Sequence, residues 1–101
     1  PRQFTGDENQ PVFEAVDLGN YRVIEVDFNV LKAGSAGSLK LQHASVNAEE
    51  YFMDLAAISA DLTSTGHDFQ EVTKFLRYVR WAAGGSVAGN PVAAIDIIAK
   101  E

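Results

Sequence analysis

Two histidines are the side chains of this sequence that titrate nearest to neutral pH. His43 and Ser45 are two positions apart, so in a β-strand they would share a face, and Asp54 follows further along the chain. A serine nucleophile also needs a sharp exposed turn, an oriented base and an oxyanion hole. The sequence lacks a glycine-flanked serine elbow, so it favours a hydrogen-bonded structural His43 over a hydrolytic dyad.

Metal ligation is the second chemistry that residue types suggest. His67 and Asp68 are adjacent in "STGHDF", but a zinc site needs three or four ligands at suitable spacing. The acidic run "GDEN", residues 6–9, offers oxygen ligands of the kind that Ca²⁺ accepts, without the length or alternation of a calcium loop. Both segments are interpreted as turns. We therefore expect no metal, no cofactor and no catalytic residue.

The composition narrows the remaining classes of function. The chain has 101 residues and no cysteine, which predicts one domain and excludes disulfides and thiolate chemistry. Its net charge of −6 opposes binding to nucleic-acid phosphates. No apolar run approaches the roughly 20 residues of a membrane span, and the polar N-terminus does not resemble a signal peptide. These features predict a cytoplasmic protein that binds neither nucleic acid nor membrane.

The elements that would position any site are mainly strands. In "YRVIEVDFNVL", residues 21–31, apolar and polar side chains alternate, and the alternation resumes in "LKLQHAS" after a glycine-serine loop. The C-terminal run "VAAIDIIAKE" follows the same rule, with Ile95 and Ile97 on one face. A short strand is predicted in "FEAVDLG", and "GGSVAGNP" is interpreted as a long connection before the last strand. These elements predict a sheet with one buried face.

The middle of the chain, residues 47–82, fits two interpretations. As helices, "NAEEYFMDLAAISADL" has Asn47 as N-cap and Glu50 as capping-box partner, with an apolar stripe behind them. As strands, the aromatic and β-branched residues of "KFLRYVRW" favour a pleated surface, and "TSTGHD" is typical of a turn. The residues alone leave an all-β fold and an α+β fold open.

The N-terminal residues are polar and contain breakers. We expect residues 1–11 to form an arm that becomes ordered only when a partner covers it, or else a free tail. Residues 12–101 would then form a single domain.

A resemblance favours the all-β alternative. The pieces "SLKLQHASVNAEEYFMDL", "TSTG" and "KFLRYVRW", followed by a Gly-Gly loop and a last apolar strand, resemble small β-sandwich proteins found among phage structural and related bacterial proteins. The resemblance implies a two-layer antiparallel sandwich of about seven or eight strands, jelly-roll or immunoglobulin-like, with residues 51–62 and 69–82 as strands. It also implies a virion protein that decorates or cements a capsid. "LRYVRW" is similar to a late strand of discoidin-type carbohydrate-binding modules.

The stretch "KFLRYVRWAAGG", residues 74–85, carries the strongest candidate for a partner surface. As a strand it would place Arg77, Val79 and Trp81 on one face and Tyr78 and Arg80 on the other. Arginine, tyrosine and tryptophan are the usual anchors of protein interfaces, although an edge arginine can simply cover the core with its stem. The residues predicted to contact a partner are Arg2, Phe4, Tyr51, Arg77, Tyr78, Arg80 and Trp81.

These expectations combine into a non-enzymatic structural protein. Its expected partners are further copies of the same chain, a major capsid protein or another virion protein, and its location is the virion, assembled in the host cytoplasm. The first alternative is a carbohydrate-binding module in which an exposed Trp81 or Tyr78 would stack on a glycan. A small hydrolase using His43 and Ser45 is the remaining one.

Overall fold

A computed structural model describes residues 1–100, whose backbone forms nine strands and two short 3-10 turns. The strands are β1 (Arg2–Gln3), β2 (Glu8–Asn9), β3 (Val16–Asp17), β4 (Val23–Lys32), β5 (Ala36–Ala44), β6 (Met53–Asp61), β7 (Gly66–Val72), β8 (Tyr78–Ala88) and β9 (Val92–Lys100); the turns are η1 (Val12–Glu14) and η2 (Glu49–Tyr51). The all-β prediction is confirmed. The α+β alternative is wrong, since η2 is the only helical segment within residues 47–82.

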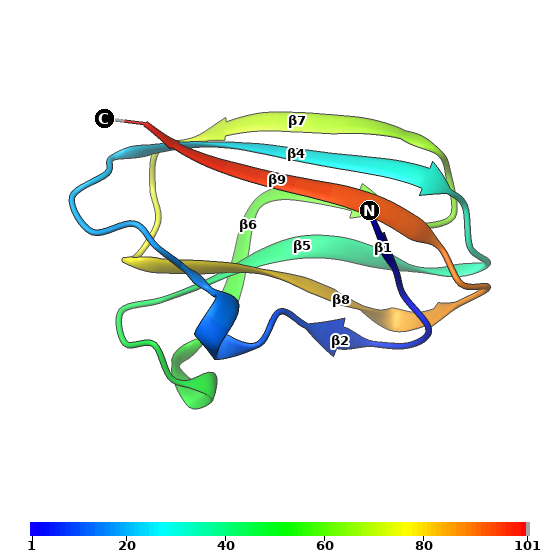
Figure 1. Cartoon of the computed structure of the whole chain (residues 1–101), viewed down its shortest axis with the longest axis horizontal. Helices are drawn as coiled ribbons and strands as arrows, with labels where there is room; N and C mark the ends of the chain where they lie inside the picture. The colour runs from blue at the N-terminus through cyan, green and yellow to red at the C-terminus, as the bar shows by residue number, and fades with distance from the viewer. Residues whose placement is uncertain (101) are drawn as a thin grey trace.

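The strands form two stacked antiparallel sheets (Figure 1). Sheet A has the order β1-β9-β4-β7, and sheet B has the order β2-β8-β5-β6 with β3 also paired to β8. The chain crosses repeatedly from one sheet to the other, so strands that are neighbours in a sheet are mostly distant in sequence. This order is that of a jelly roll, one of the two sandwich types expected from the sequence.

Period-two patterning accounts for the core between the sheets. Ile24, Val26 and Phe28 of β4 are fully buried, and Leu39 and Leu41 of β5 face them from the opposite sheet. The polar residues of β4 that alternate with them lie on the outer face of sheet A. On β9, Ile95 and Ile97 pack against the core as predicted. Burial of these apolar side chains is the main force holding the two layers together.

The strand predicted at residues 51–62 is confirmed in substance, but the one predicted at residues 69–82 is wrong. The structure divides that segment into the end of β7, a connection at residues 73–77 and the start of β8. The division is necessary because β7 belongs to sheet A and β8 to sheet B, so the chain must cross between layers. The turn expected at "TSTGHD" lies earlier, where Asp61 Oδ1 accepts hydrogen bonds from Thr63, and His67 and Asp68 already belong to β7.

The long connection predicted at "GGSVAGNP" is also shorter than expected. β8 continues to Ala88 through a bulge, where the ladder with β5 shifts register and Gly85 and Ser86 have positive φ angles. The backbone N–H of Val87 in this bulge donates to Asp7 Oδ1 at 2.8 Å. Glycines interpreted as a loop therefore supply the curvature of a strand. The predicted strand in "FEAVDLG" is likewise shorter, because η1 precedes β3.

The N-terminal residues are integrated into both sheets. β1 pairs with β9 and β2 pairs with β8, so the segment spans one side of the sandwich (Figure 1). Phe4, between the two strands, is fully buried, and its backbone N–H donates to Pro91 O at 2.9 Å. The arm expected at residues 1–11 is thus ordered without a partner, because Phe4 belongs to the core. The single domain was expected at residues 12–101, and its last residue, Glu101, lies outside the described residues.

No helical segment in the described part of the chain has the length and apolar character needed to cross a bilayer.

Candidate functional site

The aromatic and arginine side chains of β8 divide between the two faces of sheet B. Val79 and Trp81 point into the core, whereas Tyr78 and Arg80 point to the outer face, as the alternation predicts. Arg77 precedes the strand. The outer face is not open at this point, because Arg80 is only 2% exposed. At Arg80 and Trp81, the predicted partner surface is therefore covered by the chain itself.

Trp81 contacts the N-terminal segment. The ring of Phe4 meets the Trp81 ring edge-on, with 5.4 Å between centroids, and the Arg2 guanidinium lies 4.9 Å from the Trp81 centroid. Arg2 in turn is held by Glu8 at 2.8 Å. Trp81 is consequently 7% exposed and has no free ring face for a sugar. A buried Trp81 counts against the carbohydrate-binding alternative, because that alternative needs an exposed ring to stack on the sugar.

Arg80 joins three separate segments on the outer face of sheet B. Its Nε donates to Gln42 Oε1 at 2.9 Å, and a terminal nitrogen donates to the carbonyl oxygen of Gln10 at 3.2 Å. It also forms an ion pair with Glu49, and the ring of Phe52 lies 4.2 Å from its guanidinium carbon. A guanidinium with both carboxylate and aromatic partners can be buried at low cost. Arg80 is thus a structural residue.

Three of the seven residues predicted to contact a partner, Phe4, Arg80 and Trp81, are therefore buried against other parts of the same chain. Residue type identifies a side chain that is suited to contact a partner, but it does not say whether that partner lies in the same molecule. Arg2, Tyr51 and Arg77 are exposed, and Tyr78 is half-buried. Arg77 holds Asp17 with two hydrogen bonds of 2.9 and 3.2 Å, which lower the pKa of the Asp17 carboxyl.

Exposed apolar side chains gather on two projecting segments that sequence reasoning did not combine. η1 and η2 lie together on the outer side of sheet B (Figure 1), and the side-chain amide of Asn47 donates to Val12 O at 3.0 Å between them. Phe13 on η1 is 82% exposed, and Val46 and Tyr51 are about half exposed. We call Phe13, Val46 and Tyr51 the turn surface. Of these three residues, only Tyr51 was predicted to contact a partner. Phe13 was assigned to the short strand predicted in "FEAVDLG", whereas the structure places it on η1.

His43, the candidate catalytic histidine, takes part in a structural hydrogen bond. His43 Nδ1 accepts the backbone N–H of Leu76 at 3.1 Å, and burial lowers the pKa of its imidazole. Ser45 lies beyond the end of β5 and is exposed. The backbone N–H of Leu76, and not a serine hydroxyl, is thus the partner that the structure gives to Nδ1.

The candidate metal ligands are dispersed. His67 Nδ1 lies 2.9 Å from Asp27 Oδ1 on the neighbouring strand, whereas Asp68 points to the opposite face of β7. In the "GDEN" segment, Asp7 is bound to the β8 bulge and Glu8 to Arg2. Among residues 1–100, no three histidine or acidic side chains come close enough together to hold a metal ion.

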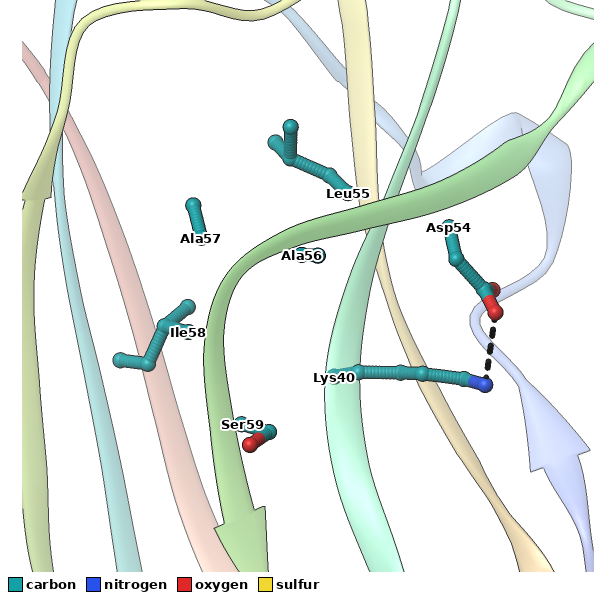
Figure 2. Close-up of a pocket in the computed structure, with 7 residues that line it drawn as sticks. All are labelled: Lys40, Asp54, Leu55, Ala56, Ala57, Ile58 and Ser59. Atoms are coloured by element: carbon teal, nitrogen blue, oxygen red, sulfur yellow. Dashed lines mark hydrogen bonds and ion pairs between the residues drawn. The ribbon is translucent and has the colours of Figure 1, made fainter.

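A shallow hollow of about 320 Å³ lies beside β6 (Figure 2). It exists because Lys40 of β5 pairs with Ser59 whereas the next residue, Leu41, pairs with Leu55, so that residues 56–58 bulge out of the ladder. Lys40 Nζ binds Asp54 Oδ2 at 2.8 Å, and this bond, followed by that from Gln42, lowers the pKa of Asp54. The rest of the wall is mainly aliphatic. With its charges already paired, the hollow offers no free acid or base.

Comparison with known proteins gives no family: no family model matches the chain, and neither a curated protein nor a solved structure shows significant similarity to it.

Proposed function

We propose that this chain is a non-enzymatic structural protein of a virus particle that decorates or cements a capsid. In this proposal it contacts a capsid or other virion protein, and also further copies of itself, and it is assembled in the host cytoplasm. Binding to nucleic acid and to membranes has no part in it.

The turn surface is the observation that carries the proposal. Phe13, with 82% of its surface exposed, is too large and too apolar to be left in water without cost, and Val46 and Tyr51 lie on the adjoining segment. Exposed apolar groups gathered on one projection mark protein interaction sites. Aromatic side chains of this kind are also the usual anchors at such interfaces.

The fold and the distribution of charge agree with a binding role. Jelly rolls recur in viral capsid proteins and in lectins, and although a fold alone does not determine function, it makes a virion role consistent with the turn surface. Several ionisable groups are already held in surface ion pairs: Lys40 with Asp54, Arg77 with Asp17 and Lys100 with Glu25. This pairing supports the non-enzymatic part of the proposal, because a paired group is not free to act as an acid or base.

Mass spectrometry of purified virus particles tests the proposal. Particles are isolated on a density gradient from cells that express a tagged copy of the chain, and the tryptic peptide of residues 81–100 is quantified against the capsid protein. A constant ratio across the particle peak is the expected result. Absence of the peptide from intact particles would overturn the virion assignment.

Matched variants connect that result to the turn surface. Phe13→Asp and Tyr51→Asp place charge on exposed positions and are expected to leave folding intact while removing the chain from particles. Leu31→Asp is the control, since Leu31 is also about half exposed but lies at the end of β4. Equal incorporation of all three variants would contradict the role of the turn surface, as would binding of a glycan with no protein partner.

A further inference from the structure

β7 is a long, regular strand edge that the sandwich leaves open. Sheet A ends at β7, which pairs with β4 over seven consecutive positions without a register shift. Of the other outer strands, β1 and β2 have two residues each and β6 is interrupted by its bulge. β9 is also open beyond β1, which covers only Val92 and Ala93, but that part of β9 carries Lys100. A regular edge presents unpaired backbone N–H and C=O groups to any strand that can lie beside it.

The side chains of β7 leave this edge accessible. All residues from Gly66 to Glu71 are exposed, and Phe69, at the centre of the strand, is 61% exposed. Neither lysine nor proline, two of the usual guards of an edge, occurs within β7, and its one charged residue on the inner face is Asp68. An exposed phenylalanine at the middle of an open edge favours the arrival of another strand.

The sequence of β7 is complementary to itself in the antiparallel direction. If two copies pair with Phe69 opposite Phe69, His67 of each copy lies opposite Glu71 of the other, and Asp68 lies opposite Gln70. The pairs are then aromatic with aromatic, imidazole with carboxylate, and carboxylate with amide. Each such cross-strand pair is favourable, and no two like charges are opposed.

The ladder with β4 shows that this pairing does not disturb the core. Phe69 pairs with Asp27, whose side chain is on the outer face, so Phe69, His67 and Glu71 all lie on the outer face of sheet A. On the inner side of the edge, the neighbouring wall is formed by Ala56 and Ala57 of the β6 bulge, beside a groove of about 430 Å³ that Gln70 also lines. These small side chains leave room for Asp68 and Gln70 of an added strand.

We propose that two copies of the chain associate through β7, antiparallel about Phe69, so that two four-stranded sheets A become one continuous sheet of eight strands. The association is isologous, because each copy presents the same strand to the other. This inference rests on the proposed function, for which it supplies the contact between copies. It uses a different surface from the turn surface, so each can fail separately.

Sedimentation velocity over a range of protein concentrations tests the association. The wild-type chain is expected to dimerise, and Phe69→Lys is expected to weaken dimerisation by about tenfold or more, because two ammonium groups then meet at the symmetry axis. Ile98→Lys is the matched control. Ile98 is 56% exposed on the same outer face of sheet A, but it lies on β9, which β4 separates from β7.

Disulfide formation tests the register. Because the chain has no cysteine, Phe69→Cys introduces a single thiol, which is expected to form a covalent dimer under mild oxidation, whereas Ile98→Cys is expected to remain monomeric. Three results would overturn the inference. The wild-type chain could be monomeric at every concentration, Phe69→Lys could dimerise as the wild type does, or a monomeric chain could bind a strand of another protein instead. If Phe69→Lys dimerises as the wild type does and the chain is still found in particles, the β7 pairing is wrong and the proposed function stands. If the β7 dimer forms but the chain is absent from particles, the pairing stands and the proposed function is wrong.

Discussion

The guanidinium carbon of Arg80 lies 4.2 Å from the centre of the Phe52 ring, on the outer face of sheet B. Through this contact, and through its bonds to Gln42, Glu49 and Gln10 O, one side chain of β8 attaches two irregular segments to the sheet. Gln10 shortly precedes η1, Glu49 belongs to η2 and Phe52 follows it, so Arg80 also supports the turn surface.

Arg80→Met is therefore expected to lower the free energy of unfolding by about 2 kcal/mol, because it leaves Gln42 and the Gln10 carbonyl without their donor. Arg77→Met is the control. Arg77 forms its ion pair with Asp17 in solvent, where such pairs contribute little to stability. Urea unfolding followed by circular dichroism measures both variants. An equal loss of unfolding free energy in the two variants would show that the burial of Arg80 adds nothing to stability.

Phe4→Ala is expected to lower the free energy of unfolding by about 3–4 kcal/mol, since it opens a cavity between the sheets. The neighbouring exposed residue provides the control variant Thr5→Ala, expected to be near neutral. Removal of residues 1–10 should have a larger effect and shift the emission of Trp81, the only tryptophan, to longer wavelength. A truncated chain as stable as the full one would restore the expectation that residues 1–11 form an arm that is not part of the folded core.

The stability of the fold is expected to fall as the pH drops below about 6.5, owing to His43. Burial lowers the pKa of its imidazole from the ordinary 6.5, so the unfolded chain binds this proton more readily than the folded one. The contribution of neutral His43 is present above the unfolded pKa and is lost as the pH falls toward the folded pKa. The slope should stay below the one-proton limit of about 1.4 kcal/mol per pH unit.

His43→Asn should remove this step, because its side-chain oxygen can accept the Leu76 N–H without titrating. His67→Asn, at an exposed histidine of β7, serves as the control and should retain it. A further loss is expected below about pH 3.8, where Asp17 and Asp54, whose pKa values are lowered by Arg77 and Lys40, become protonated. Urea unfolding at a series of pH values measures both steps. An identical profile for His43→Asn and wild type would contradict the assignment.

Gly37→Ala is expected to destabilise the fold by about 2 kcal/mol or more. Gly37 has a φ angle of +119°, and an added Cβ would lie 2.7 Å from Val87 Cγ2, opposite the β8 bulge. The control is Gly84→Ala, one position before that bulge, where a Cβ would meet nothing within 4 Å. Thermal unfolding compares them, and similar midpoints would show that the bulge adapts to a side chain.

Much of the fold was predictable, because alternation is a local property. The side chains of β4, β5 and β9 show which face is buried without reference to any other strand, and they indicate two pleated layers. In the middle of the chain, apolar spacing was compatible with both helix and strand, and a resemblance was needed to favour the strands. The candidate interface was predicted less well, since residue type alone suggested Phe4, Arg80 and Trp81.

The sequence by itself thus determined the β-rich core and the absence of cysteine chemistry, because alternation and composition need no knowledge of distant contacts. Only the tertiary structure decided that Phe4 closes the core, that Arg80 is covered by η2, and that Phe13 and Phe69 remain outside. These outcomes depend on pairing between residues up to 91 positions apart, as for Arg2 of β1 with Ala93 of β9. Strands of two residues are too short to show a periodicity, and the residues that cover Arg80 come from separate loops, so no local pattern records their meeting.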